Sequence, residues 1–319
     1  MPQIEVPAPG QPHAIVTRDG EAGVLDLDRS TLIDHYKTHG ALLLRGFDVD
    51  VAEFRAFAQQ FCSTSVVNES PGRQSIDPEA HIYTVDAGTR AFPLHPELSR
   101  EPWKPDVAFF GCLSAPTHGG KTTICDGVAL AQVLPAELHE RLARRRLLYI
   151  QSTWPSLLNY WLGTATPSEA QLANPPPGCP YEFRRFPQGI ARIFSRPALH
   201  KPMFVDAPAF GNFLLFARAL GHPESVVLDD GLPMPEHWMQ VIAATAERLT
   251  VPIDWRSGDL LMLDNTRFMH GRTEITEPAE RLILTYFGYL SFAIPDPEEP
   301  PNAIWRRENF EPPRRDSTA

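Results

Sequence analysis

The sequence of 319 residues has no long apolar run and no basic stripe. Its longest apolar runs, such as Ala41–Leu44 and Leu260–Leu263, are far shorter than the roughly 20 residues that a membrane-spanning helix needs. Lys and Arg total 29 against 39 Asp and Glu, which gives a net charge of −10, whereas nucleic-acid binders usually carry a basic stripe. These absences argue against membrane and nucleic-acid partners and favour a small-molecule substrate.

Cysteine is also scarce, and its pattern excludes one class of site. The four cysteines contain no CxxC pair, so we expect buried apolar residues and no zinc site made of cysteines. The first residues, MPQIEVPAPGQPHA, lack a basic segment followed by an apolar one, so no secretion signal is predicted. We therefore expect a cytoplasmic protein. No pattern in the sequence indicates an oligomeric state.

Proline, by contrast, is abundant, with 33 residues. Proline blocks helix interiors and central strands, so a loop-rich chain with short elements is expected. Strand-like runs occur in two blocks, with helical patterns before and between them, and this order favours a mainly β jelly roll with helices. We predict a single domain over residues 1–319, with the core at about 40–290 and a helical and loop insertion at about 127–250.

The spacing of apolar residues predicts the individual elements. Helices are expected at Ser30–Thr38 with Ser30 as N-cap, Val51–Phe61, Leu130–Arg146 with a break near Pro135, Phe210–Leu220 and Glu236–Leu249. Strands are expected at Ala41–Arg45, His81–Val85, Val107–Leu113, Thr122–Cys125, Val251–Asp254, Asp259–Asp264, His270–Thr273 and Arg281–Tyr289.

The sharpest local motif is Leu94-His95-Pro96-Glu97-Leu98. In an extended segment, residues i and i+2 point to the same face, so His95 and Glu97 are expected to point into one cavity. An imidazole beside a carboxylate supplies two of the three groups of the facial triad that holds iron(II). His-x-Glu is common by chance, however, and a loose pair on a surface strand gives the same pattern.

A third candidate ligand occurs in the second half of the chain. His270 follows the apolar run Leu260–Leu263 and the turn-prone pair Asp264-Asn265, and it is expected where the next strand begins. A lone histidine at such a position is more often structural. The residues that follow it give it more weight.

Two residues suit the binding of a small carboxylate. Arg281 lies 11 residues after His270 (281 − 270), where a buried strand is expected, and its permanent charge needs an anion there. Thr122 lies 27 residues after His95 (122 − 95), and its hydroxyl can donate to the same anion. The distal carboxylate of 2-oxoglutarate fits such a pair in bidentate geometry. A salt bridge from Arg281 to Glu277 or Glu280 is the alternative.

Together these motifs resemble the taurine/2,4-D dioxygenase-like (TauD/TfdA) superfamily, in whose order they occur over about residues 40–290. The motifs that carry the resemblance are Leu42-Leu43-Leu44-Arg45-Gly46-Phe47, His95-Pro96-Glu97, Gly119-Gly120-Lys121-Thr122, His270-Gly271-Arg272 and Arg281. Within the superfamily, the chain is similar to the branch that hydroxylates amino acids for peptide natural products. This finer resemblance rests on Asn68-Glu69-Ser70-Pro71, Tyr83-Thr84 and Pro93-Leu94-His95-Pro96-Glu97.

The resemblance implies both a fold and an activity. The implied fold is a double-stranded β-helix with an insertion between its two ligand-bearing halves. Iron(II) is expected on His95, Glu97 and His270, and 2-oxoglutarate on Thr122 and Arg281, with O₂ as the other co-substrate. The implied reaction is hydroxylation of an unactivated C–H bond in an amino-acid-like or natural-product intermediate. Desaturation, epoxidation or cyclisation would need only a different substrate pose.

Two departures from the family narrow the chemistry. The carboxylate is Glu97 where the taurine enzyme has Asp, as in the clavaminate-synthase-like branch. Because this position is not Ala or Gly, the vacancy that binds halide in halogenating relatives is absent, and halogenation is disfavoured. The taurine enzyme places a sulfonate-binding arginine four residues after its 2-oxoglutarate arginine. Thr285 stands at that position here, so a sulfonate substrate is disfavoured.

Substrate contacts are predicted at Arg73, Tyr83 and Arg272. Arg73 can clamp a carboxylate or remain a solvated loop charge, and Arg272 can contact a second anion or form a structural salt bridge. The substrate can be free or tethered to a carrier protein. Two other classes stay open, namely a metal hydrolase that uses zinc on the same ligands and a non-catalytic binding barrel. The pair Thr122 and Arg281 weighs against the hydrolase, and the presence of all five positions weighs against the binding protein.

Overall fold

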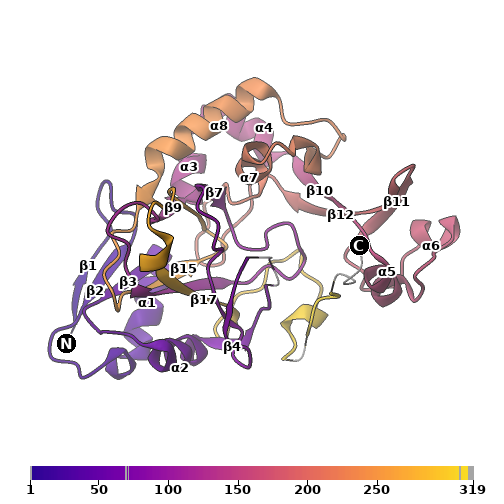
Figure 1. Ribbon diagram of the computed structural model, residues 1–319. Helices are drawn as coiled ribbons and strands as arrows, with labels where there is room; N and C mark the ends of the chain where they lie inside the picture. Colours follow the sequence, from indigo (N-terminus) through magenta and orange to yellow (C-terminus); the bar gives the residue numbers. More distant parts are fainter. Residues whose placement is uncertain (1, 69, 71, 309, 315–319) are drawn as a thin grey trace.

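The computed structural model describes residues 2–68, 70, 72–308 and 310–314, and its largest element is a nine-stranded sheet (Figure 1). The strands of this large sheet are β1 (Gln3–Glu5), β2 (Ala14–Thr17), β3 (Ala41–Arg45), β4 (Cys62–Ser65), β5 (Ser75–Asp77), β6 (Ile82–Thr84), β8 (Val107–Ser114), β15 (Leu260–Asp264) and β17 (Leu282–Leu290). Their order is β1-β2-β3-β15-β8-β17-β6-β5, and β4 also pairs with β17. The central strands β8, β15 and β17 are almost wholly buried, as their apolar sequences require.

A second, smaller sheet carries the predicted ligands. Its strands are β7 (Phe92–His95), β9 (Thr122–Asp126), β14 (Val251–Pro252) and β16 (Phe268–Arg272), in the order β14-β9-β16-β7. One apolar core joins both sheets, because Ile124 of the small sheet and Phe110 and Phe287 of the large sheet pack in the same cluster. The fold is the predicted mainly β jelly roll with helices.

The alternation of side chains along the small sheet determines which residues face this core. Met269 pairs with Cys125, and His270 pairs with Ile124 on the other face. Cys125 and Met269 pack against the helices of the insertion, whereas Ile124 packs between the two sheets. His270 therefore points into the space between the sheets, because it shares a face with Ile124.

The helices flank the two sheets on opposite sides, except for two that project from the body (Figure 1). They are α1 (Arg29–His39), α2 (Val51–Phe61), α3 (Gly127–Val133), α4 (Ala136–Ala143), α5 (Pro155–Leu162), α6 (Glu169–Ala173), α7 (Leu214–Ala219) and α8 (Glu236–Leu249). The bounds of α2 and α8 are those predicted from apolar spacing. The predicted N-cap of α1 was wrong. Asp28 caps this helix by accepting a hydrogen bond from the Thr31 amide at 2.7 Å.

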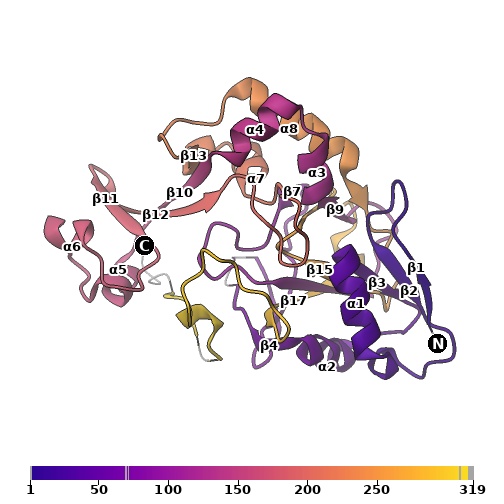
Figure 2. The ribbon, with the colours of Figure 1, turned by 180° about the vertical axis from the view of Figure 1, so that it is seen from behind.

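The segment between β9 and β14 forms a sheet of its own. Its strands are β10 (Arg146–Ser152), β11 (Glu182–Phe186), β12 (Gly189–Pro197) and β13 (Val226–Leu228), in the order β11-β12-β10-β13. The hairpin β11–β12, with α5 and α6, projects from the body on the side away from β1 and β2 (Figures 1 and 2). This segment occupies the predicted insertion, while the division of the chain into domains stays a prediction.

Several predicted boundaries in the insertion were wrong. The expected helix over Leu130–Arg146 is broken near Pro135 as predicted, but Arg146 already begins strand β10. The helix expected from Phe210 begins only at Leu214, whose amide donates a hydrogen bond to the Asn212 side chain at 3.1 Å. In the part of the chain that the structure describes, no helix combines the length and apolarity needed to cross a membrane.

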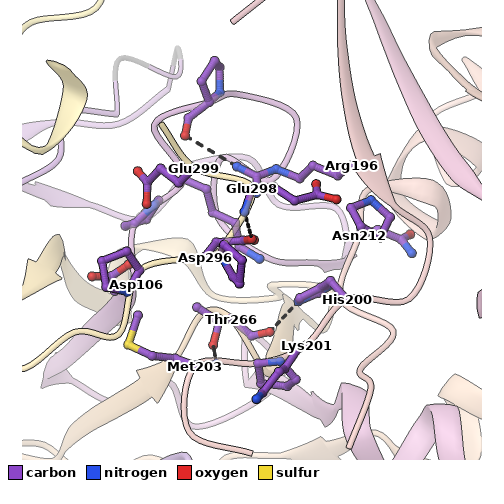
Figure 3. A pocket seen from close by; sticks show the side chains of 18 of the residues that line it. Asp106, Arg196, His200, Lys201, Met203, Asn212, Thr266, Asp296, Glu298 and Glu299 are labelled. Carbon is purple, nitrogen blue, oxygen red and sulfur yellow. Dashed lines mark hydrogen bonds between the residues drawn. The ribbon is translucent and has the colours of Figure 1, made fainter. Parts of the chain in front are cut away.

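A cavity of about 680 Å³ lies between the jelly roll and the insertion (Figure 3). Its walls come from the loop after β7, from β10 and β12, from the loop that follows β12, and from the C-terminal segment after β17. Arg146 on β10 joins Glu298 at 2.7 Å, and Arg306 joins Asp106 at 2.9 Å. These ion pairs hold the C-terminal segment against the cavity.

Candidate metal centre

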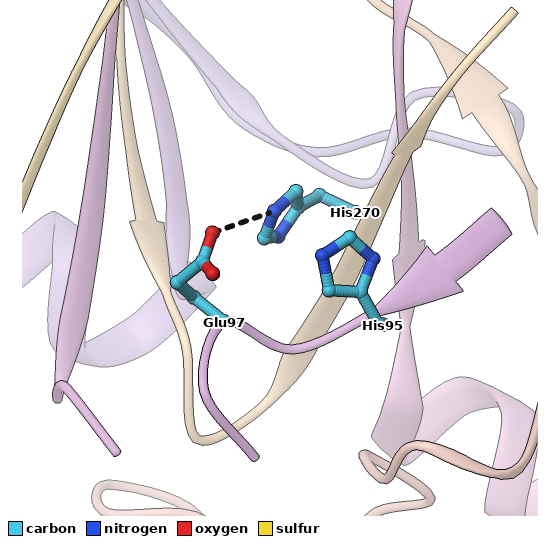
Figure 4. Close-up of side chains that lie close together, drawn as sticks. All are labelled: His95, Glu97 and His270. Carbon is cyan, nitrogen blue, oxygen red and sulfur yellow. Dashed lines mark ion pairs between the residues drawn. The ribbon is translucent and has the colours of Figure 1, made fainter. Parts of the chain in front are cut away.

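His95, Glu97 and His270 come together between the two sheets (Figure 4). His95 is the last residue of β7 and lies directly opposite His270 of β16 in the strand pairing. The two imidazole ring centroids are 4.6 Å apart, and one ligand atom from each of the three residues lies within 4.8 Å of the others. All three side chains are buried. His270 is the middle residue of β16, although it was expected where the strand begins.

The local structure that positions Glu97 differs from the one predicted. Strand β7 ends at His95, so Glu97 lies in the following loop and not two residues further along a strand. Asn265 fixes this loop. The Glu97 amide donates to Asn265 Oδ1 at 2.7 Å, and Asn265 Nδ2 donates to the Glu97 carbonyl at 3.0 Å. Asn265 is fully buried, so these bonds form in a dry environment.

The protonation states suit a divalent metal. His95 Nδ1 lies 2.9 Å from the Pro93 carbonyl, which can only accept, so Nδ1 carries the proton and Nε2 keeps its lone pair. Burial, followed by the nearby His270, lowers the pKa of His95 to about 3. Burial would raise the pKa of Glu97, but Arg73 and the two imidazoles outweigh it and lower this pKa to about 2. Metal binding needs this neutral imidazole and this ionised carboxylate.

The donor set therefore fits iron(II). Two imidazoles and one carboxylate on one face of a metal ion leave coordination positions open for other ligands. His270 Nε2 lies 3.6 Å from Glu97 Oε2, and its Nδ1 is buried without a hydrogen-bond partner among the described residues.

Arg73, from the loop between β4 and β5, reaches Glu97. Its Nη2 lies 3.1 Å from Glu97 Oε2, and its Nη1 donates to Thr285 Oγ1 at 3.1 Å. The guanidinium also lies over the Phe287 ring at 5.2 Å. Its side chain is only 10% exposed, so the alternative of a solvated loop charge does not hold. Asn68 Nδ2 donates to the other carboxylate oxygen of Glu97 at 2.6 Å.

Thr122 and Arg281 lie at one end of the small sheet. Thr122 pairs with Arg272, two residues along β16 from His270, so its side chain lies on the His270 face. Its hydroxyl oxygen accepts from Trp255 Nε1 at 3.0 Å, which leaves the O–H group able to donate elsewhere. Arg281 Nε donates to the Gly120 carbonyl at 2.7 Å.

The local chain leaves room for Arg281 and supplies no anion for it. A Cβ on Gly120 would lie 2.9 Å from Arg281 Cδ, so glycine is required there, and its φ of +60° suits glycine as well. No carboxylate in the described part of the chain lies within 4.0 Å of the Arg281 guanidinium. Glu280 instead accepts from the Thr117 hydroxyl at 2.6 Å. Burial, followed by nearby Arg272, lowers the pKa of Arg281 to about 10. An anion bound beside Arg281 would offset the effect of burial and of the nearby Arg272 on this pKa.

The other predicted substrate residues lie close by in different roles. The Arg272 guanidinium donates to the carbonyls of Asp86 at 2.6 Å, Arg90 at 2.9 Å and Gly88, and so fastens that loop. The salt bridge expected as its alternative is not formed in the described part of the chain. The Tyr83 carbonyl accepts from the Thr285 hydroxyl at 3.0 Å. Substrate contact by Arg272 and Tyr83 stays a prediction.

Asn265 and Asn68 contact Glu97 but were not predicted as site residues. Asn265 was noted only as part of a turn-prone pair, and Asn68 only within the motif Asn68-Glu69-Ser70-Pro71, of which Glu69 and Pro71 lie outside the described residues. Both make their contacts with Glu97 across large sequence separations, 168 residues for Asn265 and 29 for Asn68. The spacing of residues in the sequence gives no information about such pairs.

The chain is similar to known proteins over most of its length. The family model described as taurine catabolism dioxygenase TauD, TfdA family matches residues 10–286. A clavaminate synthase-like protein of Arabidopsis thaliana is 23% identical over 268 residues, which cover 75% of this chain and 79% of that protein.

Solved structures share the fold. PvcB from Pseudomonas aeruginosa is described as an Fe, alpha-ketoglutarate dependent oxygenase from an isonitrile synthetic pathway. It aligns with a TM-score of 0.58 and 18% identity, over 89% of this chain and 88% of PvcB. AAD-2, solved in complex with Mn(II) and N-oxalylglycine, aligns with a TM-score of 0.57 and 12% identity, over 93% of this chain and 99% of AAD-2.

Proposed function

The chain belongs to the TauD/TfdA family of dioxygenases, and from that premise we propose that it hydroxylates an unactivated C–H bond in an amino-acid-like or natural-product intermediate. As a member of the family it is a 2-oxoglutarate-dependent non-haem iron oxygenase. Iron(II), when bound, supplies the oxidative decarboxylation of 2-oxoglutarate and the activation of O₂. Desaturation, epoxidation or cyclisation would require only that the substrate lie differently at the same site.

We assign the metal ligands to His95, Glu97 and His270. The observation that carries this assignment is the convergence of two imidazoles and one ionised carboxylate, all buried, whose ligand atoms lie within 4.8 Å of one another. Asn265 fixes the loop of Glu97, and the Pro93 carbonyl fixes the ring of His95. Such supporting bonds set the direction of the donor atoms.

We assign the distal carboxylate of 2-oxoglutarate to Arg281 and Thr122. Arg281 is a largely buried cation with no carboxylate partner in the described part of the chain, and its permanent charge makes an anion there favourable. Thr122 lies on the His270 face of the small sheet, and Trp255 orients its hydroxyl. A zinc hydrolase or a binding protein would have no use for this anion site, and the family membership also argues against both.

Arg73 supports a substrate that carries a carboxylate. Its guanidinium lies beside Glu97, a proposed metal ligand, and its Nε is buried without a partner among the described residues. A bidentate contact with an α-carboxylate would satisfy it. We therefore propose an amino-acid-like substrate, free or tethered through another part of its structure. PvcB acts in an isonitrile pathway, and this agrees with a natural-product intermediate.

The experiment that tests the proposal uses metal-free protein under anaerobic conditions. Iron(II) and then 2-oxoglutarate are added while the visible spectrum is recorded. A weak charge-transfer band that needs both additions supports 2-oxoglutarate on the iron, and succinate release then screens amino acids and their derivatives as substrates. If metal analysis shows bound iron but no band forms, the assignment of the co-substrate site is wrong. Arg281→Ala serves as the control that should bind iron without giving the band.

A further inference from the structure

The cavity between the jelly roll and the insertion is separate from the metal centre. None of the three proposed ligands lines it, and its volume of about 680 Å³ falls in the range of small-molecule sites, roughly 300–1,000 Å³. Part of its wall is formed by residues 294–300 and by Trp305 and Arg306. These residues come after residue 286, where the match to the family model ends, so the cavity is partly built by chain outside that match.

Two cations face this cavity without a carboxylate. The Lys104 ammonium has no carboxylate within 4.0 Å in the described part of the chain, and Arg196 donates only to the carbonyls of Glu101 and Pro102. Arg196 Nε is buried without a hydrogen-bond partner among the described residues. Figure 3 shows Arg196 and His200 on the same cavity. A buried positive charge is unfavourable unless it is paired.

The acidic residues of the wall are mostly engaged elsewhere. Asp106 accepts two hydrogen bonds from Arg306, Glu298 accepts two from Arg146, and Glu299 accepts from Arg306 and Trp305. Asp296 accepts from the Glu298 amide at 2.9 Å and is the remaining acid on that segment. Burial, followed by the charge of Arg196, lowers the pKa of Lys104 to about 7. The acidic side chains of the cavity wall therefore do not fully compensate the positive charges of Lys104 and Arg196.

The rest of the wall is largely apolar. Prolines of four different segments line it, together with Phe194, Met203 and Phe204. We propose that this cavity is a second ligand site for an amphipathic organic anion. Its carboxylate or phosphate head lies between Lys104 and Arg196, and its apolar body lies along the proline and phenylalanine wall. Charge alone would suit any small anion, but the apolar wall favours one with a hydrocarbon part.

The proposed site shares two segments with the metal centre. Lys104 and Pro105 belong to the loop that continues from Glu97, and Asn265 Nδ2 donates to the Pro105 carbonyl at 2.8 Å as well as to the Glu97 carbonyl. Thr266 lines the cavity next to Asn265, and its carbonyl lies 2.6 Å from His200 Nε2. A bound anion would therefore contact the loop and the turn that position Glu97.

The test is isothermal titration of the metal-free protein at pH 6.5, so that it does not depend on the oxygenase reaction. Octanoate and octyl phosphate are the probes, and 1-octanol is the neutral control. We expect one saturable site for at least one of the anions and none for 1-octanol. Hexanoate should bind roughly tenfold more weakly than octanoate, because two buried methylenes are lost.

Variants at the head-group position make the test specific. Lys104→Met should weaken binding of the anion at least tenfold, while Lys104→Arg should retain it. Lys201→Met is the matched control, because Lys201 lies on the same cavity but is 60% exposed and is paired with Asp206 at 2.6 Å. It should change binding less than twofold. Circular dichroism and the melting temperature establish that each variant is folded.

Three results would overturn the proposal. These are the absence of saturable binding by both anions, equal binding of 1-octanol, and unchanged binding in Lys104→Met. Should Lys104→Met fail to fold, Met203→Trp provides the second test, because it fills the cavity without altering its charge. Met203→Trp should abolish binding of the anion, and retention of full affinity in that variant would place the anion elsewhere.

Discussion

Arg73 and Glu97 form a buried ion pair, with Arg73 Nη2 3.1 Å from Glu97 Oε2 and side-chain exposures of 10% and 6%. The two residues come from different loops, and Glu97 is at the same time a proposed metal ligand. When a metal takes the Glu97 carboxylate, the charge that compensates Arg73 is shared with the metal. A guanidinium cannot release its proton, so Arg73 then favours a second anion at the site.

The first prediction concerns this pairing. Arg73→Met should raise the KM for a carboxylate substrate by roughly 30-fold or more, because a buried charge-assisted contact is lost. Arg73→Lys should recover part of the loss, because lysine keeps the charge but not the bidentate geometry. Steady-state succinate release, measured while each substrate is varied, separates the two KM values. An equal rise in the KM for 2-oxoglutarate would contradict a substrate role and indicate general damage to the site.

The second prediction concerns the metal. His270→Ala should lower iron(II) affinity by more than about 100-fold, because it removes one of three donors, whereas even loss of a supporting bond costs 10–100-fold. Metal analysis after equilibrium dialysis measures this directly. His237→Ala is the control, because His237 is exposed on α8. Unchanged iron content in His270→Ala would remove His270 from the ligand set.

The third prediction concerns the co-substrate. Arg281→Ala should raise the KM for 2-oxoglutarate by roughly 30-fold or more, because the distal carboxylate loses its charged partner. Iron affinity should stay within twofold, since Arg281 is not a proposed ligand. Arg256→Ala, an exposed arginine in the neighbouring loop, should leave both quantities unchanged. If Arg281→Ala shows the wild-type KM, 2-oxoglutarate is held by other residues.

The sequence predicted the candidate ligands but not the contacts that hold them in place. His95 and His270 could be predicted because each lies in or at the end of a strand, where the alternation of side chains sets direction. Glu97 was predicted for a wrong reason, because strand β7 ends before it and the direction of its side chain comes from a loop. That loop is held by Asn265, a contact across 168 residues, and only tertiary packing determines such a pair.

The burial of charged side chains could not be predicted from the sequence either. Arg73 was ambiguous in the sequence, since a loop arginine is usually solvated. Its burial depends on Thr285 and Phe287 of strand β17, more than 200 residues away. In contrast, the bounds of α2 could be predicted fully, because its apolar spacing and its Asp50–Glu53 capping box are local. Local patterns determined elements and ligand candidates, while long-range contacts determined the electrostatics of the site.

The fourth prediction concerns Asn265. Asn265→Ala should lower the free energy of unfolding by about 2–4 kcal/mol, because three hydrogen bonds are lost and buried groups of Glu97 and Pro105 are left unpaired. Iron affinity should fall 10–100-fold, because the loop of a ligand is freed. Urea denaturation and metal analysis measure the two effects. Asn174→Ala, at an exposed site, should change neither by a comparable amount. A stability loss without a loss of iron affinity would separate Asn265 from the metal centre.

The last prediction concerns Lys104 and pH. Burial and Arg196 lower the pKa of Lys104 from 10.5 to about 7, while Asp264, Asp296 and Asp106 partly oppose the change. Between about pH 7 and 10 the unfolded chain therefore holds a proton that the folded chain has released, so this residue makes stability rise with pH, by at most about 1.4 kcal/mol per pH unit.

Lys104→Met removes this proton, and Lys104→Arg cannot release one. The free energy of unfolding of the wild type should therefore increase relative to both variants as the pH is raised from 6 to 9, with no anion present. Urea denaturation at each pH gives the difference, in which the titration of groups that do not interact with Lys104 cancels. A difference that stays constant over this range would mean that Lys104 keeps its proton in the folded protein. Charge compensation from within the chain would then be sufficient, and the cavity would have less need of an anion.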